Sequence, residues 1–188
     1  MTITVSIVED NAGTRESLSR LFQRAPGITC LRSYATGEDA VRGIPTEVPD
    51  VALVDINLPG MSGIDCVRHL KRTCPQMLVL MLTTYEESDL IFNSLQAGAN
   101  GYLLKKMPAE EIVEAVGHVH AGGAPMSMQI ARKVVAYFHG RREAPGEMGQ
   151  LSKRENEILR LLSRGFLYKE IAEELAISRA KQLFGIAK

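Results

Sequence analysis

The amino-acid sequence predicts an α/β fold, in which a doubly wound, five-stranded parallel sheet is followed by a small all-α segment. Short apolar runs rich in β-branched residues alternate with segments of helical period through residues 1–121. These runs are apolar on both faces, which is typical of parallel strands covered by helices on each side. Beyond residue 150 the helical period returns without further strand-like runs. The two patterns therefore predict two structural units of different class.

Five strands and three helices can be assigned from the pattern. The helical spacing is clearest at Leu18 to Ala25, at Val67 and Leu70, and at Ile112 to Val119. In an open parallel sheet, ligands collect at the carboxyl ends of the strands. The ends of the predicted strands are therefore the place to seek functional residues. The predicted strands are Ile3–Val8, Ile28–Tyr34, Val51–Ile56, Leu78–Leu82 and Gly101–Leu104.

The chain divides into three parts by composition. Residues 1–121 hold the α/β pattern, and residues 122–150 hold a helix-like stretch, Met128–Phe138, followed by a connector rich in Gly and Arg. Residues 151–188 resume the helical period, with Ser152 and the glutamate three positions later forming a capping box. We therefore expect one α/β domain, a helical linker and a small helical domain.

Composition and charge exclude several classes of protein. The chain has 188 residues, of which 45% are apolar, and no apolar run is long enough to span a membrane. The amino-terminal residues lack the pattern of a secretory signal, so we expect a cytoplasmic protein without a membrane partner. Residues 1–121 carry 10 basic and 15 acidic residues, whereas residues 151–188 carry 8 and 5. An acidic front and a mildly basic rear are consistent with a cation-binding domain joined to one that meets nucleic acid. The cysteines have no paired spacing and are expected to be reduced and structural: Cys30, Cys66 and Cys74.

Charged and hydroxyl side chains follow four of the predicted strands. Glu9 and Asp10 end the first strand and Asp55 ends the third, while Thr83 and Lys105 end the fourth and fifth. Because carboxyl ends of parallel strands meet at one edge, we expect these side chains to lie together. Clustered carboxylates repel, and a hard divalent cation such as Mg²⁺ relieves the repulsion. Asp55 is then a candidate nucleophile toward a phosphoryl group, with Thr83 and Lys105 stabilising the transferred charge.

Each of these residues also has a structural interpretation. An aspartate at a strand end is often a helix cap or a turn residue, and a single lysine is often a solvated side chain. A threonine at this position can also simply end a strand. The order of an acid pair, an acid, a hydroxyl and an amine on four strand ends favours the phosphoryl-transfer interpretation.

Four sequence blocks resemble the signature of response-regulator receiver domains, over residues 3–121. They are Ile-Val-Glu-Asp-Asn at 7–11, Leu-Val-Asp-Ile-Asn-Leu-Pro-Gly-Met-Ser-Gly at 53–63, Met-Leu-Thr-Thr at 81–84 and Gly-Tyr-Leu-Leu-Lys at 101–105. The resemblance implies a flavodoxin-like sheet of strand order 2-1-3-4-5. It implies that Asp55 accepts the phosphoryl group, and that Glu9, Asp10, Asp55 and the backbone carbonyl of Asn57 hold Mg²⁺. It also implies a switch pair of Thr83 and Tyr102, although Tyr102 could instead be an aromatic residue at an interface edge.

Residues 151–178 resemble the LuxR-type (NarL/FixJ) helix-turn-helix domain, through Leu-Ser-Lys-Arg-Glu, Leu-Leu-Ser-Arg-Gly, Lys-Glu-Ile-Ala-Glu-Glu-Leu and Ile-Ser. A plain helical hairpin remains the alternative on pattern alone. The resemblance implies contacts to promoter DNA from Lys169, Ser178, Arg179 and Lys181. After Ser178 the sequence departs from the family pattern, and the chain stops before a fourth helix. We therefore expect a truncated or divergent recognition helix that binds DNA weakly.

The sequence favours a two-component response regulator that is phosphorylated on Asp55 by a partner histidine kinase and controls transcription through the helix-turn-helix. It predicts a phosphoacceptor rather than an enzyme with its own substrate, with phosphorylation-dependent homodimerisation. The alternative is a protein-interaction switch in which the receiver surface binds protein and the tail does not read DNA. A free-standing Mg²⁺-dependent hydrolase fits less well, because no separate substrate pocket or general base is evident.

Overall fold

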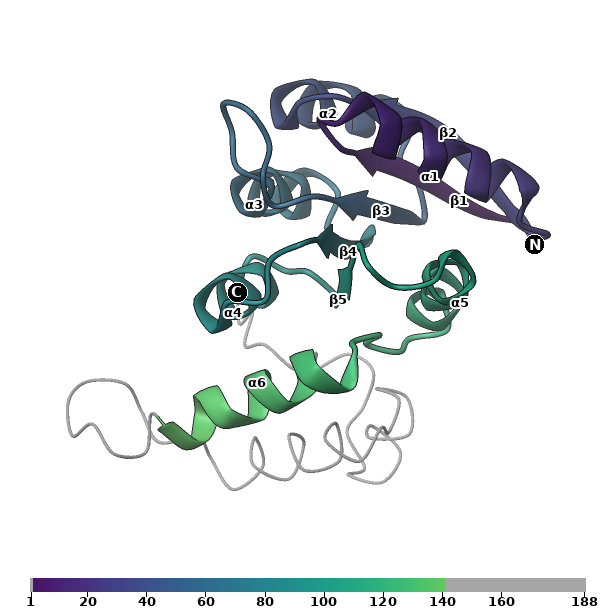
Figure 1. Ribbon diagram of the computed structural model, residues 1–188. Helices are drawn as coiled ribbons and strands as arrows, with labels where there is room; N and C mark the ends of the chain where they lie inside the picture. Colours follow the sequence, from purple (N-terminus) through teal and green to yellow (C-terminus); the bar gives the residue numbers. More distant parts are fainter. Residues whose placement is uncertain (1, 141–188) are drawn as a thin grey trace.

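The computed structural model describes residues 2–140 and confirms the predicted α/β class (Figure 1). Five parallel strands form one sheet in the order β2-β1-β3-β4-β5. The strands are β1 (Ile3–Val8), β2 (Ile28–Tyr34), β3 (Val51–Val54), β4 (Leu78–Thr83) and β5 (Gly101–Leu104). The helices are α1 (Ala12–Arg24), α2 (Gly37–Gly43), a short 3-10 turn η1 (Ile44–Thr46), α3 (Gly63–Thr73), α4 (Ser88–Gln96), α5 (Ala109–His120) and α6 (Met128–Gly140).

Helices cover both faces of the sheet and form two apolar cores. α1 and α5 pack on one face, where Phe22 and Val116 are fully buried. α2, α3 and α4 pack side by side on the other face, where Leu70 and Ile91 are buried (Figure 1). Because both faces are covered, the central strand β3 is buried and apolar at every residue, as the apolar runs of the sequence predicted.

Side-chain caps start three helices close to the carboxyl edge of the sheet. Asn11, three residues after the end of β1, is the N-cap of α1, and its Oδ1 accepts a hydrogen bond from the backbone N–H of Thr14 at 2.9 Å. Thr36 caps α2 and Ser62 caps α3 in the same way. An N-cap satisfies a backbone donor that would otherwise lack a partner. These caps fix where the chain leaves each strand, and therefore where the adjacent loop residues lie.

The predicted third strand was two residues too long. The backbone ladder ends at Val54, and Asp55 Oδ1 accepts a hydrogen bond from the N–H of Ile56 at 2.7 Å, so the chain turns out of the sheet there. Gly63 then packs directly against the Asp55 carbonyl, where an added Cβ would lie 1.7 Å from the oxygen. Only glycine allows this approach of α3 to the end of β3.

The helix predicted at Met128–Phe138 is present as α6 and extends to Gly140. It lies beside α4, below β5 in the view of Figure 1. Lys169, Ser178, Arg179 and Lys181, predicted to contact DNA, lie outside the described residues. Of the helices within residues 2–140, none combines the length and the hydropathy needed to cross a membrane.

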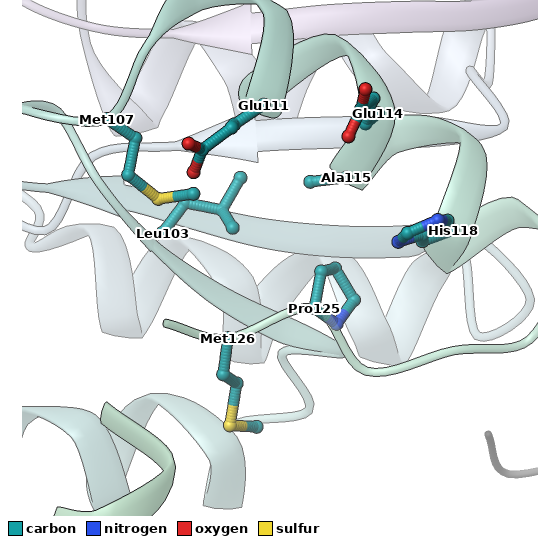
Figure 2. Close-up of a pocket in the computed structure, with 8 residues that line it drawn as sticks. All are labelled: Leu103, Met107, Glu111, Glu114, Ala115, His118, Pro125 and Met126. Carbon is teal, nitrogen blue, oxygen red and sulfur yellow. The ribbon is translucent and has the colours of Figure 1, made fainter. Parts of the chain in front are cut away.

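A groove of about 380 Å³ lies between α5 and the segment that precedes α6 (Figure 2). Met107 and Leu103 line one end, and Glu111, Glu114 and His118 project from α5 along its side. Pro125 and Met126 form the opposite wall. The groove contains none of the strand-end carboxylates singled out by the sequence.

Candidate functional site

Backbone hydrogen bonds beyond the strand ends hold the predicted site residues in place. The N–H of Glu9 donates to the carbonyl of Tyr34 at 3.0 Å, and the N–H of Asp55 donates to the carbonyl of Val8 at 2.9 Å. The N–H of Lys105 donates to the carbonyl of Thr83 at 2.9 Å. Each residue is thus fixed by its neighbouring strand, so the site inherits the rigidity of the sheet.

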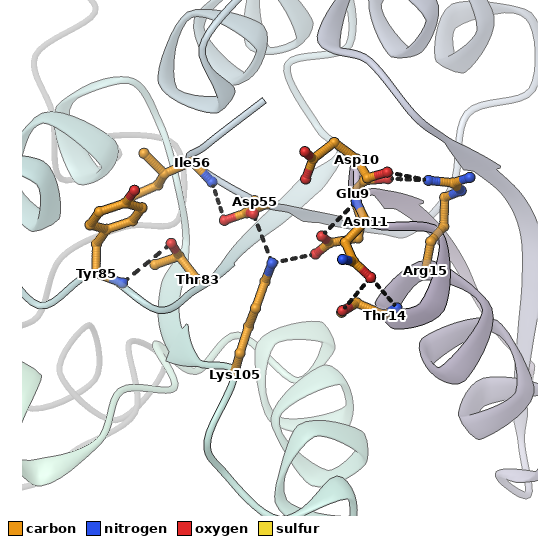
Figure 3. A network of polar contacts seen from close by, with 10 residues as sticks. All are labelled: Glu9, Asp10, Asn11, Thr14, Arg15, Asp55, Ile56, Thr83, Tyr85 and Lys105. Carbon is orange, nitrogen blue, oxygen red and sulfur yellow. Dashed lines mark hydrogen bonds and ion pairs between the residues drawn. The ribbon is translucent and has the colours of Figure 1, made fainter. Parts of the chain in front are cut away.

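The three carboxylates predicted to cluster do so (Figure 3). One oxygen each of Glu9, Asp10 and Asp55 lies within 4.8 Å of the others, and no second group of this kind occurs among residues 2–140. Glu9 is 2% exposed and Asp55 is 5% exposed, whereas Asp10 faces solvent. The cluster therefore has two buried carboxylates and one that is open to entering ligands.

Lys105 lies between the two buried carboxylates. Its Nζ is 2.6 Å from Glu9 Oε2 and 2.7 Å from Asp55 Oδ2 (Figure 3). Burial raises the pKa of Glu9, against the opposing effect of its hydrogen bond with Lys105. Burial acts to lower the pKa of Lys105, but the hydrogen bonds to Asp55 and Glu9 outweigh it and leave that pKa raised. Lys105 is therefore a charged amine that neutralises part of the acidic cluster.

Thr83 and Tyr102 both bond to the backbone of Tyr85. Thr83 is fully buried at the end of β4, and its Oγ1 accepts a long hydrogen bond of 3.4 Å from the N–H of Tyr85. The Tyr102 hydroxyl donates to the carbonyl of Tyr85 at 2.9 Å, and its ring is fully buried. Burial raises the pKa of Tyr102 well above its ordinary value, so the phenol stays protonated. The two residues predicted as a switch pair therefore meet at one loop residue.

Asn57 lies in the exposed loop that follows Asp55. The loop is closed at its base by a hydrogen bond of 2.9 Å from the N–H of Gly63 to the carbonyl of Ile56. Carboxylates and carbonyl oxygens are the hard donors that Mg²⁺ prefers. The carboxylates at this edge of the sheet fit a small divalent cation, since three anionic oxygens converge with only one amine to balance them.

Two further residues support the site and had not been predicted. The Arg15 guanidinium donates from one nitrogen to the carbonyls of Glu9 and Asp10, at 2.7 and 2.9 Å, and so holds the acid pair from α1 (Figure 3). Glu38 Oε1, from α2, accepts the N–H of Met61 at 2.8 Å in the loop after Asp55. The first contact is local: Arg15 lies on the first turn of α1, which begins directly after the acid pair and Asn11, so the sequence pattern could have suggested it. The second joins residues 23 positions apart, and no local signal announces it.

A parallel sheet of order 2-1-3-4-5, with an acidic cluster and a lysine at its carboxyl edge, defines a receiver-type α/β domain. Comparison with known proteins supports this assignment to the receiver class. The family pattern of the response regulator receiver domain matches residues 5–117, and that of the bacterial regulatory proteins of the luxR family matches residues 149–180. The chain therefore belongs to the response regulators that combine a receiver domain with a LuxR-type helix-turn-helix.

Its relatives include transcriptional regulators. The chain is 34% identical to the transcriptional regulatory protein LnrK of Bacillus subtilis over 184 residues, which cover 94% of this chain and 84% of LnrK. It is 31% identical to the response regulator UvrY of Escherichia coli K12, over 94% of this chain and 81% of UvrY. A LuxR-family response regulator from Aurantimonas sp. SI85-9A1 superposes with a TM-score of 0.69 at 30% identity, over 76% of this chain and all of that one.

Proposed function

We propose that this response regulator is phosphorylated on Asp55 and controls transcription according to its phosphorylation state. The observation that carries the proposal is the position of Asp55. It is buried at the edge of the sheet beside the carboxylates of Glu9 and Asp10, and its Oδ2 pairs with the Lys105 amine. A carboxylate so placed is shielded from bulk water and lies next to a positive charge. That environment favours attack by the Asp55 carboxylate on a phosphoryl donor.

The transfer forms one bond and breaks another. A carboxylate oxygen of Asp55 attacks the phosphorus of a phosphohistidine on a partner kinase, or of a small acyl phosphate. The bond from phosphorus to the imidazole nitrogen, or to the acyl oxygen, breaks as the new bond forms, and the donor leaves with the electron pair. Lys105 Nζ, 2.7 Å from Asp55 Oδ2, is close enough to move onto the phosphoryl oxygens and offset their charge. The Thr83 hydroxyl is the second group that would bond the product.

The acidic cluster supports a role for Mg²⁺ in this transfer. Glu9, Asp10 and Asp55 would supply carboxylate ligands, and the backbone carbonyl of Asn57 would complete the protein's contribution. A bound Mg²⁺ supplies positive charge at the transferring oxygens and orients the phosphoryl group. Arg15 contributes by holding the backbone carbonyls of Glu9 and Asp10, which fixes the backbone from which these two carboxylates project.

Thr83 and Tyr102 are the proposed switch. Both anchor Tyr85, one through its N–H and the other through its carbonyl, so a change at either residue alters the same loop. If Thr83 turns toward a phosphoryl group on Asp55, the Tyr85 N–H loses its acceptor. The position of the loop between β4 and α4 would then depend on the chemical state of Asp55.

The remaining assignments extend the proposal to the rest of the chain. We place the receiver domain at residues 1–121, the linker at 122–150 and the helix-turn-helix at 151–188. The expected partners are a sensor histidine kinase in the cytoplasm and promoter DNA, with a homodimer formed on phosphorylation. Lys169, Ser178, Arg179 and Lys181 remain the proposed DNA contacts. The departure from the family pattern after Ser178 favours, as the second candidate, a receiver that acts through protein contacts alone.

Phosphorylation by acetyl phosphate with Mg²⁺ tests the proposal. Intact-mass measurement should show one added phosphoryl group on the wild type and none on Asp55→Asn, because an amide is not a nucleophile here. Asp39→Asn, which removes an exposed carboxylate of α2 that pairs with Arg42 and does not belong to the cluster, is the matched control and should be phosphorylated normally. Stable phosphorylation of Asp55→Asn would show that Asp55 is not the acceptor. Salt-dependent binding to relatives' promoter sites separates the two candidate outputs.

A further inference from the structure

The loop between β3 and α3 carries the backbone carbonyl of Asn57, which is the proposed fourth protein ligand for Mg²⁺. Asp55 follows β3 directly, whereas Asn57 lies two residues further into the loop and is exposed. No backbone N–H among residues 2–140 donates to the Asn57 carbonyl. That oxygen is therefore available to a cation, and its position depends on what holds the loop.

Glu38, on the first turn of α2, holds the far end of this loop. Its Oε1 accepts a hydrogen bond from the backbone N–H of Met61 at 2.8 Å. Gly60 lies against the same carboxylate with a φ of 75°, and a Cβ added there would lie 2.5 Å from Oε1. The loop thus closes tightly around the Glu38 carboxylate, and only glycine permits so close an approach in this backbone conformation.

The contact from Glu38 is the loop's long-range support. Within the described part of the chain, it is the only hydrogen bond that joins residues 57–61 to a distant element; their other bond is local, from the N–H of Leu58 to the carbonyl of Ile56 at 3.2 Å. α2 adds packing at its first residue, because a Cβ added to Gly37 would lie 3.2 Å from the Met61 carbonyl oxygen. The first turn of α2 therefore fixes the end of the loop that the sheet does not hold.

We propose that Glu38 is a positioning residue of the Mg²⁺ site, which acts by holding the loop so that the Asn57 carbonyl meets the cation. The inference rests on the proposed function, since it needs Mg²⁺ bound at the acidic cluster. Mg²⁺ requires near-octahedral geometry and short distances to oxygen, so it gains from a carbonyl that is held in place before it binds. Ca²⁺ accepts longer and more variable distances, so it gains less. Glu38 therefore raises both the affinity for Mg²⁺ and the preference for Mg²⁺ over Ca²⁺.

Three substitutions at Glu38 separate the effect of the hydrogen bond from that of the charge. Glu38→Gln keeps an acceptor oxygen at the same reach and loses the charge. Glu38→Asp keeps the charge but is one methylene shorter, so its oxygens fall short of the Met61 N–H. Glu38→Ala loses both. Asp39→Ala is the matched control, since it removes a carboxylate from the same turn that pairs with Arg42 and makes no hydrogen bond to the loop.

The first experiment titrates Mg²⁺ and, separately, Ca²⁺ into the 188-residue chain, followed by calorimetry or tyrosine fluorescence. Glu38→Ala and Glu38→Asp should bind Mg²⁺ about tenfold more weakly than the wild type, the lower end of the range typical for losing a residue that supports a metal ligand. Glu38→Gln and Asp39→Ala should bind Mg²⁺ nearly as the wild type does. The affinity for Ca²⁺ should change much less in all four variants, so the preference for Mg²⁺ falls in the two weakened ones.

Phosphorylation by acetyl phosphate gives a second readout. In Glu38→Ala, the Mg²⁺ concentration that gives half the maximal rate should rise about tenfold, while the rate at saturating Mg²⁺ should match the wild type. A merely structural role would instead lower the saturating rate, because part of the protein would be unfolded. Urea denaturation of each variant measures that unfolded fraction.

Three results would overturn the inference while leaving the proposed function intact. The first is wild-type affinity for Mg²⁺ in Glu38→Ala. The second is wild-type affinity in Glu38→Asp together with weak binding in Glu38→Gln, which would mean that the charge acts across space and the loop contact does not matter. The third is an equal loss of affinity for Mg²⁺ and Ca²⁺ in Glu38→Ala. Wild-type affinity for Mg²⁺ in Asp55→Asn would instead contradict the proposed metal site, and this inference with it.

Discussion

Replacing Lys105 with Met should tighten the binding of Mg²⁺ to the acidic cluster. Lys105 forms two charge-assisted contacts, 2.6 Å to Glu9 and 2.7 Å to Asp55, and both acceptors are proposed metal ligands. A cation that binds Glu9 Oε2 or Asp55 Oδ2 therefore competes with the amine for that oxygen. Methionine keeps most of the apolar length of the side chain and removes the competing charge.

The expected effect is about tenfold in affinity. A hydrogen bond to a charged group contributes about 1.5–3 kcal/mol. The Lys105 side chain is 19% exposed, so solvent reduces its contribution toward the lower limit. Removing a competing contact of about 1.4 kcal/mol tightens binding by about tenfold. The same substitution should slow phosphorylation by acetyl phosphate, because no amine remains to offset the charge on the transferred group.

Titration with Mg²⁺ in the absence of any phosphoryl donor measures this affinity directly, by calorimetry or by tyrosine fluorescence. Lys106→Met is the control, since Lys106 pairs with Glu86 on the surface and touches none of the three carboxylates. It should bind Mg²⁺ as the wild type does. An unchanged or weaker affinity for Mg²⁺ in Lys105→Met would refute the argument that the Lys105 amine competes with the cation for the carboxylates of Glu9 and Asp55.

Three further predictions concern the support of the site and the stability of the fold. Arg15→Ala should weaken Mg²⁺ binding several-fold, measured by the same titration, because the carbonyls of Glu9 and Asp10 lose their common donor. Gly63→Ala should abolish phosphorylation and lower the free energy of unfolding by about 1–3 kcal/mol in urea, since a Cβ would lie 1.7 Å from the Asp55 carbonyl. Gly117→Ala, where nothing lies within 4 Å, should instead stabilise α5 by about 1 kcal/mol, and equal effects at the two sites would contradict the packing argument. Hydrogen bonds from the backbone and hydroxyl of Thr4 lower the pKa of Asp50, so this carboxylate stabilises the fold above its ordinary pKa and loses that effect as pH falls through the lowered value. Asp50→Asn should therefore cost about 1–2 kcal/mol at neutral pH, and the difference from the wild type in urea denaturation should shrink as the pH falls below the ordinary pKa of an aspartate.

The fold could be predicted from the sequence because its signals are local. The mostly apolar runs from Ile3 to Val8 and from Gly101 to Leu104 coincide with β1 and β5, since strands covered by helices on both faces are largely apolar. The composition of the candidate site was equally accessible. Parallel strands bring their carboxyl ends to one edge, so Glu9, Asp55 and Lys105 had to meet if the strands were assigned correctly.

Contacts between distant segments were decided by the tertiary structure alone. The bond from Glu38 to the N–H of Met61 and the docking of Lys133 on the carbonyl of Glu86 join residues 23 and 47 positions apart. Backbone carbonyls and N–H groups are chemically alike at every position, so no sequence signal marks which one a side chain will reach. The end of β3 is a similar case, because Ile56 is as apolar as the strand before it, and the chain leaves the sheet through the hydrogen bond of Ile56 to Asp55 and the packing of Gly63 on Asp55. Residue type and periodicity thus determine which groups are available, and the three-dimensional path of the chain determines which of them act on one another.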